Sequence, residues 1–391
     1  MLAKSDALFK IRDDLDKNDF VGTAPAPFVG HHGYPYLNVG VLSTPFILDE
    51  VWEYDAPRYW AAKNYQIPQI IDFRSSLINS RFKAHAHDKN KLLELSQEVG
   101  MASAPVDIEL NLEEKPKFRL SIDAYTAPMG ANAILKKAYL TSNPKIHTKV
   151  EKVNSDIDLK ANDAILYLYK NNFDENFLTK LLSVGTIGVK NSRKLVPTRW
   201  SITAVDDNIG KSLIEEVKQF NEAEHLAFFG SYLGNYYLIL SFPGPWSYEL
   251  FETYLPKASW NSGDELSFTT DYENFDGRKE YAENCAGGYY AARLPILEKL
   301  KENKRQGTIL ALRFITGEYA VPLGVWVVRE AVRKAMSNKP IEFSDRGLML
   351  KYAEILIKKK FGIELSKIIR KSVVLENIKN QTKLSSFFNL F

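Results

Sequence analysis

Helical and hairpin patterns follow one another irregularly along this chain, and this irregularity limits the folds open to it. Three segments have the apolar spacing of amphipathic helices: 89–100, 159–171 and 174–184. Alternating apolar and polar residues predict two hairpins, one pairing 106–112 with 118–122 and one pairing 226–229 with 236–242 around Gly234-Asn235. Because no strand–helix–strand rhythm repeats, we predict an α+β fold of helices mixed with antiparallel hairpins.

Other segments give weaker local signals. Residues 22–40 are rich in glycine and proline, so we expect loop or irregular edge strand there, and the pattern from 49 to 100 is helical. Segment 200–205 is expected to be a strand, after which Asp206 would begin a helix. Further expectations are helices at 281–301, 325–336 and 345–360, the last capped by Ser344, and a strand at 308–314.

The chain is long enough for more than one hydrophobic core. We expect an N-terminal α+β region at 1–184, which contains a loop rich in glycine, proline and histidine, and a C-terminal α+β region at 185–374. Apolar content falls after about Val374 until the last residues. Residues 375–391 are therefore expected to be a flexible tail.

The single cysteine, Cys285, excludes an intrachain disulfide and a zinc site made only of cysteines. Such cysteine usage is typical of a reducing compartment, so we expect a cytoplasmic, nucleoid-associated protein. The first residues, MLAKSDALFKIRDD, lack the apolar stretch of a signal peptide. No apolar run approaches the roughly 20 residues of a membrane helix, so no membrane contact is expected.

Positive charge is concentrated at the C-terminal end. The whole chain has a net charge of +3, whereas residues 351–391 contain nine Lys or Arg and three Glu, a net of +6. A basic region of this kind favours contact with DNA or with an acidic protein surface. A solvated helix face explains the same charges, and the sequence leaves both explanations open.

Two histidines lie between glycines in the segment GHHG (30–33). Glycine lets a backbone approach a ligand closely. The imidazoles of His31 and His32 can serve as general acid or base, as phosphate ligands or, with His85 and His87, as half of a metal site. The alternative is a structured turn with exposed rings. We take His31 and His32 as candidate catalytic residues and expect no metal.

Arg199, Asp206 and Asp207 lie where a strand is expected to lead into a helix. Two carboxylates at a helix start are stabilised by the helix dipole, which is a structural role. The same pair can hold a divalent cation against a phosphate. Asp206 and Asp207 are candidate catalytic residues on this second basis, and Arg199 of the same segment is a third candidate.

Two later segments supply further candidates. The glycines of 287–293 precede an expected helix that contains Arg293, and free N–H groups there can hold a phosphate. Glu318, Arg329 and Glu330 lie in an otherwise apolar segment, where charges must be paired or functional. A grip on a phosphodiester and a buried structural network explain these charges equally well.

The last eleven residues, QTKLSSFFNLF, form a recognisable pattern. Residues three and four apart share one side of a helical turn, so Leu384, Phe387 and Phe388 would form an apolar plug beside Gln381. The pattern resembles the PCNA-interacting peptide (Q-x-x-h-x-x-aromatic-aromatic) that docks on DNA sliding clamps, and all four fixed positions match. The alternative is a tail that folds back onto its own domain. We predict that these four residues bind PCNA and that DNA is a second partner.

Several longer blocks resemble the archaeal Nre family of DNA repair proteins, and they span most of residues 24–336. The blocks are PFVGHHGYPYLNVG, IDFRSSLINSR (as a helix), VEKVNSDIDLKA, LVPTRWSITAVDDNIGK, GGYYAARLPILEKL and EYAVPLGVWVVREAVR. The resemblance implies a response to DNA damage with recruitment through the clamp. It assigns no catalytic residue.

Many members of that family resemble one another in a cysteine-rich zinc ribbon before the glycine–proline segment. Residues 1–23 here contain no cysteine, so we expect no zinc, and no cofactor is assigned. Our leading hypothesis is a clamp-recruited DNA repair factor. A non-catalytic repair adaptor and a nucleotide- or ADP-ribose-processing enzyme are the alternatives, and the sequence leaves open whether the chain is an enzyme.

Overall fold

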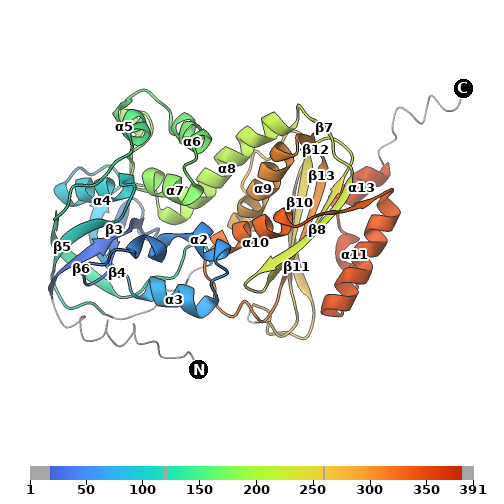
Figure 1. Cartoon of the computed structure of the whole chain (residues 1–391), viewed down its shortest axis with the longest axis horizontal. Helices are drawn as coiled ribbons and strands as arrows, with labels where there is room; N and C mark the ends of the chain where they lie inside the picture. The colour runs from blue at the N-terminus through green and yellow to red at the C-terminus, as the bar shows by residue number, and fades with distance from the viewer. Residues whose placement is uncertain (1–17, 118–121, 123, 259, 381–391) are drawn as a thin grey trace, which may run out of the picture. The chain divides into compact units, whose positions relative to one another are not determined.

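The computed structural model describes residues 18–117, 122, 124–258 and 260–380 (Figure 1). The chain divides into two compact units. The first contains residues up to 209 together with 321–330, and the second contains 210–320 together with the residues from 331 onward. Each unit has one six-stranded mixed sheet and several helices, which confirms the predicted α+β class.

The expected boundary between residues 184 and 185 differs from this division. The chain leaves the first unit within helix α8 (Thr198–Val217), and it returns and leaves again around the first residues of helix α10 (Trp326–Ser337). The crossings at 209–210 and 330–331 lie inside helices and give no signal in the composition, whereas the return at 320–321 lies in the non-helical segment that contains Pro322 and Gly324.

The sheet of the first unit has the strand order β1-β5-β6-β4-β3-β2. Its strands are β1 (Asp19–Ala24), β2 (Ala26–Val29), β3 (Tyr36–Ser43), β4 (Ile78–His85), β5 (Val106–Leu112) and β6 (Asn132–Leu140). Neighbouring strands are antiparallel except β4 and β6, which are parallel. The second strand of the hairpin expected at 118–122 falls mostly outside the described residues, and β5 pairs instead with β1 and β6.

The helices of the first unit surround this sheet. They are η1 (Val51–Asp55), α2 (Pro57–Ala62), α3 (Ile67–Ser75), α4 (Lys91–Met101), α5 (Thr148–Ser155), α6 (Ala161–Lys170), α7 (Glu175–Ser183), η2 (Lys190–Ser192) and the start of α8. Helices α4, α6 and α7 confirm the three helical segments predicted from apolar spacing. Side chains such as Leu37, Ile108 and Leu110 are fully buried in the core, together with Val99 of α4.

The expectation of loop or irregular edge strand at 22–40 is only partly right: β1 and β2 are the two edge strands of this sheet and residues 30–35 form a turn, whereas β3 is an inner strand. Strand β3 lies between β2 and β4. Val39 and Val41 are fully buried, so tertiary packing outweighs the local turn signals. Similarly, the helical pattern expected from 49 to 100 is interrupted by β4. The block IDFRSSLINSR is therefore not one helix, because α3 ends at Ser75 and a strand begins at Ile78.

The sheet of the second unit has the strand order β11-β10-β13-β9-β8-β14. Its strands are β8 (His225–Tyr232), β9 (Asn235–Phe242), β10 (Ser247–Tyr254), β11 (Ser267–Glu273), β13 (Thr308–Ile315) and β14 (Ile341–Phe343), and a separate pair consists of β7 (Asn221–Glu222) and β12 (Arg305–Gln306). The β8–β9 hairpin confirms the prediction at Gly234-Asn235. Gly234 has φ +73°, and a Cβ there would overlap the backbone nitrogen of Tyr319.

Helices cover both faces of this second sheet. Helix α9 (Ala286–Glu302) lies on one face, and α11 (Arg346–Phe361) and α13 (Val373–Asn380) lie on the other, with α12 (Ser366–Ile369) between them in sequence (Figure 1). All eight residues of β13 are buried, as expected for a strand covered on both sides. Met349, Ile357 and Val374 pack with Leu312 in the core between sheet and helices.

Three local expectations in α8 and α11 were wrong. Segment 200–205 is not a strand, and Asp206 does not begin a helix, because both lie inside α8. The isoleucine, threonine and valine of that segment favour a strand locally, and the longer helix overrides them. The cap of α11 is Asp345 and not Ser344, since the Asp345 carboxylate accepts a hydrogen bond from the Leu348 N–H at 2.9 Å.

Residues 375–380, expected to begin a flexible tail, belong to helix α13. Val374 is fully buried, and Leu375 and Ile378 pack against the core. The buried carboxylate of Glu249 on β10 accepts hydrogen bonds from the Val373 and Val374 N–H groups (3.0 and 3.1 Å). The second unit therefore holds the chain up to Asn380, whereas Gln381, Leu384, Phe387 and Phe388 lie outside the described residues.

Candidate functional site

The segment GHHG connects β2 to β3 in the first unit and forms a tight turn. The Gly30 N–H donates to the Asn38 carbonyl at 2.8 Å, and the Tyr36 N–H donates to the Gly33 carbonyl at 2.8 Å. Gly33 has φ +83°, a conformation that favours glycine. The rings of His31 and His32 lie against each other with centroids 3.8 Å apart. The turn thus presents two imidazoles at the end of β2.

Arg199 lies in the first turn of α8, which hydrogen bonds hold next to the same strand. The Val29 N–H donates to the Thr198 hydroxyl at 3.0 Å, and Ser183 shares a hydrogen bond of 3.0 Å with Thr198. The Arg199 guanidinium lies over the ring of Tyr125, 3.6 Å from its centroid. This cation–π contact holds the group in place while leaving its N–H donors available.

These elements border one cleft of about 810 Å³. The charged and imidazole groups that line it come from four places in the sequence: His31, His32, Arg81, Glu114, Lys117 and Arg199. Three side-chain amides, those of Asn38, Asn79 and Asn132, also line it. Lys117 forms a surface ion pair with Glu114 at 2.8 Å. The cleft is therefore basic and rich in hydrogen-bonding groups.

Two of the cleft's cations have no counter-charge within the described residues. Arg81 and Arg199 are half-buried, and neither forms an ion pair with a carboxylate there. A guanidinium presents several donors in a planar fork that matches phosphate and carboxylate oxygens. The chemistry that this arrangement supports best is the binding of a phosphate-bearing ligand.

A second charged cluster in the first unit is internally paired. Asp55 accepts from Arg74 and from Lys180, each at 2.8 Å. Burial alone would raise the pKa of Asp55, but Lys180 and Arg74 outweigh it and hold this pKa below its usual value. The adjoining cavity has only about 70 Å³, room for a few waters. We assign this cluster a structural role.

Asp206 and Arg329 form a second buried ion-pair group in the first unit. The Arg329 guanidinium donates to both carboxylate oxygens of Asp206, at 2.7 and 2.9 Å, and lies 3.6 Å from Glu175. Asp206 and Arg329 are both buried. An acid so engaged is poorly placed to hold a metal ion against a phosphate, so the geometry favours the structural alternative for this pair.

The remaining candidates do not line the cleft. Glu330 is buried and Asp207 is half-buried. In the second unit, Arg293 is completely buried and pairs with Glu273 at 2.6 Å, while Glu318 is exposed and accepts from the Tyr236 hydroxyl at 3.2 Å. The described candidates that share one site are thus His31, His32 and Arg199.

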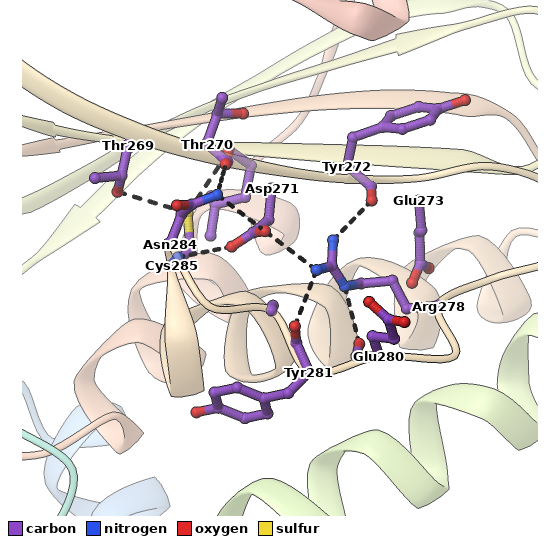
Figure 2. Close-up of polar contacts among 12 residues, drawn as sticks. Thr269, Thr270, Asp271, Tyr272, Glu273, Arg278, Glu280, Tyr281, Asn284 and Cys285 are labelled. Atoms are coloured by element: carbon purple, nitrogen blue, oxygen red, sulfur yellow. Dashed lines mark hydrogen bonds and ion pairs between the residues drawn. The ribbon is translucent and has the colours of Figure 1, made fainter.

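A polar cluster in the second unit organises the connection from β11 to α9 (Figure 2). The Arg278 guanidinium donates to the carbonyl oxygens of Tyr272 and Tyr281, at 2.9 and 3.0 Å, and Asp271 accepts from the Cys285 N–H at 2.7 Å. Burial raises the pKa of the Cys285 thiol far above its usual value, so the thiol stays protonated at neutral pH. This cluster fixes a loop and offers no reactive nucleophile.

Sequence reasoning missed Arg81 and Lys117. Arg81 lies in β4, where it pairs in register with Gly40 of β3 and with Ile134 of β6. The only local signal was the alternation of 78–85, which the helical expectation for that region hid.

No group of three or more histidine, cysteine or acidic side chains within the described residues is arranged to hold a metal ion. None of the described helices has the length and apolarity to span a bilayer.

Fold and cleft together define a two-unit α+β protein with a basic site in its first unit. The family description "Archaeal Nre, N-terminal" matches residues 1–261, and "Archaeal Nre, C-terminal" matches residues 273–387. The chain therefore belongs to the archaeal Nre family, as the resemblance of several of its sequence blocks predicted.

Curated relatives match over most of the chain. The DNA repair protein NreB of Archaeoglobus fulgidus is 36% identical over 94% of this chain and 91% of its own length. The DNA repair protein NreA of the same organism is 36% identical over 96% of this chain and 91% of its own length. NreA of Haloferax volcanii is 34% identical over 81% of this chain and 78% of its own length. No solved structure matches this chain.

Proposed function

We propose that this chain is a DNA repair protein that acts in the response to DNA damage and is recruited to DNA by the sliding clamp PCNA. The observation that carries the repair role is the name shared by its relatives: each is a DNA repair protein, and two of them align over more than nine-tenths of this chain. Similarity of that extent covers the cleft of the first unit and both sheets.

The clamp contact is proposed from the C-terminal motif. Gln381, Leu384, Phe387 and Phe388 supply the polar contact and the apolar anchors of a clamp-binding peptide. In such peptides a few buried aromatic side chains provide most of the binding energy. Because α13 keeps the chain packed up to Asn380, the motif would start within one residue of the second unit. Little chain would separate a bound clamp from the protein.

DNA contact is supported by charge in two places. One is the cleft of the first unit, and the other is the surface of α11 to α13. The last turn of α11 carries Lys358, Lys359 and Lys360, and α12 and its flank add Lys367 and Arg370. Basic side chains next to a clamp peptide favour the DNA that passes through the clamp.

The clamp contact is tested by capture of the full chain on immobilised PCNA. We expect Phe387→Ala/Phe388→Ala to lower the retained fraction at least about tenfold, because it removes both aromatic anchors. Ser385→Ala/Ser386→Ala changes two variable positions of the same peptide and serves as the matched control. Equal retention of the two double variants would refute the clamp contact.

The repair role is tested in cells. A strain that lacks the gene should lose viability after treatment with a DNA-damaging agent, and the wild-type gene should restore it. If the strain with the deletion survives damage as well as its parent, the proposed repair role is wrong.

A further inference from the structure

We infer that the cleft of the first unit binds unpaired nucleotides of single-stranded DNA, with the phosphates on Arg81, Arg199 and Lys117 and the bases against Tyr34 and Trp200. The inference rests on the proposed repair role only in naming DNA as the polymer. Three observations carry it: the size of the cleft, two arginines without a carboxylate partner among the described residues, and an exposed aromatic pair.

The size of the cleft excludes a duplex from its interior. Its volume of about 810 Å³ lies within the roughly 300–1,000 Å³ of pockets that enclose small organic molecules. A few nucleotides of one strand fit a space of this order. A double helix is too wide, since its major groove alone is about 12 Å across. An occupant with several phosphates must therefore be unpaired.

The charges of the cleft match a phosphodiester backbone. Arg81 comes from β4, Arg199 from the start of α8, and Lys117 from the segment after β5, so the cations approach the cleft from different elements. Arg81 and Arg199 have no carboxylate partner within the described residues, in contrast to Arg74 and Arg329 of the same unit. An arginine that is spared an internal partner remains available to an external anion.

An exposed aromatic pair closely follows cleft-lining residues in the sequence. Tyr34 follows His32 by two residues and Trp200 follows Arg199, and their rings contact each other with centroids 5.4 Å apart. Tyr34 is 42% exposed and Trp200 is 47% exposed. Aromatic faces in solvent beside a basic groove are the usual platform for unpaired bases, because any base can stack on them. Paired bases within a helix offer no free face.

The polar groups between these cations suit nucleotides better than a simple anion. The side-chain amides of Asn38, Asn79 and Asn132 each carry donors and an acceptor, and both kinds of partner occur on base edges and sugars. The Asn79 side-chain nitrogen donates to the Asn132 side-chain oxygen, Oδ1, at 3.3 Å, so these two side chains are held together on the cleft wall. A nucleotide can engage both the donors and the acceptors of these side chains.

The test is fluorescence anisotropy with a labelled 20-nucleotide thymidine strand and a 20-base-pair duplex, using the full chain without PCNA. We expect tighter binding of the single strand. Arg81→Ala/Arg199→Ala should weaken this binding at least about tenfold and reduce the slope of log affinity against log salt by about 1.4, the value for two phosphate contacts on a single strand. The matched control, Lys160→Ala/Lys170→Ala, removes two exposed charges, one from the N-cap and one from the last turn of α6, and should stay within about twofold of wild type.

A second pair of variants tests the aromatic contact independently. Trp200→Ala should weaken single-strand binding about fivefold or more while leaving the salt slope unchanged, because a stacked base carries no charge. Trp52→Ala removes a tryptophan of similar exposure, 41%, from the same unit and should have no effect. Unfolding curves of all four variants control for stability.

Two results would overturn the inference. One is that the cleft variants bind the single strand as tightly as their controls. The other is that a deoxynucleoside monophosphate displaces the strand at concentrations no higher than the strand itself requires, which would make the cleft a mononucleotide site. Neither result bears on the proposed clamp contact, because the PCNA capture assay tests Phe387 and Phe388 and not the cleft.

Discussion

Replacing Glu249 by alanine should detach helix α13 from the second unit. The carboxylate is buried on β10 and accepts from the Ser372 hydroxyl at 2.6 Å and from the N–H groups of Val373 and Val374 at 3.0 and 3.1 Å. Loss of a helix cap costs about 1–2 kcal/mol, and each donor left without a partner adds to this. Release of a buried charge offsets part of the loss, so we expect the free energy of unfolding to fall by about 2 kcal/mol.

The raised pKa of Glu249 predicts that Glu249→Gln lowers the free energy of unfolding less than Glu249→Ala does. Burial raises this pKa despite the hydrogen bonds from Ser372 and α13, so the site favours a neutral group. Because the pKa of Glu249 is higher in the folded than in the unfolded state, the stabilisation that Glu249 contributes is full below about pH 4.3. This stabilisation is lost as the pH rises through the pKa of the folded state. At pH 7, Glu249→Gln should therefore cost no more than about 1 kcal/mol.

The assay is urea unfolding at pH 7 combined with hydrogen exchange of the amides of α13. Glu376→Ala is the matched control, because it removes an exposed carboxylate from the first turn of the same helix and should cost about 0.3–1 kcal/mol. Glu249→Ala should also speed exchange in α13 more than exchange in β13. If Glu249→Ala costs no more than Glu376→Ala and leaves exchange in α13 unchanged, the reasoning is refuted.

Three further predictions concern the first unit. Arg329→Met should lower the free energy of unfolding by about 3–5 kcal/mol, since it leaves Asp206 buried without this cation, and Asp206→Leu/Arg329→Met should recover most of the loss in the same unfolding assay. Gly40→Ala should lower the free energy of unfolding by about 1–3 kcal/mol and weaken binding of single-stranded DNA in the anisotropy assay, because the added Cβ would overlap the Asn79 amide on the cleft wall. An unchanged free energy of unfolding would contradict this close packing of Gly40 against Asn79. The pKa of Asp55 is lowered, so its stabilisation is present above about pH 3.9 and is lost as the pH falls through the folded pKa. The stability difference between wild type and Asp55→Asn should therefore shrink at acid pH, and a pH-independent difference would contradict this assignment.

Local signals in the sequence predicted the elements that depend on few residues. The hairpin at Gly234-Asn235 is specified by its turn, and helices α4, α6 and α7 by long amphipathic spacing. Strand β4 was missed because its short apolar alternation lies within a helical background. Segment 200–205 was misassigned because its β-branched residues favour a strand, whereas α8 is continuous through them.

The site was only partly predictable for a different reason. The glycines around His31 and His32 indicated a special turn, and Arg199 lay in a distinctive block. Arg81 reaches the same cleft only because β4 pairs with both β3 and β6, which is a matter of long-range register. Likewise, the pairing of Arg329 with Asp206 joins distant segments, so the sequence could state the alternatives of phosphate grip and buried network without choosing between them.

The most direct test of the account measures how PCNA loaded on primed DNA changes binding of this chain. Wild type should bind the loaded template more tightly than the bare one. Phe387→Ala/Phe388→Ala should lose this gain and keep wild-type affinity for bare single-stranded DNA, whereas Arg81→Ala/Arg199→Ala should lose affinity for the bare strand and keep the gain. If the loaded clamp leaves the affinity of wild type unchanged, the account of a clamp-recruited repair protein is contradicted.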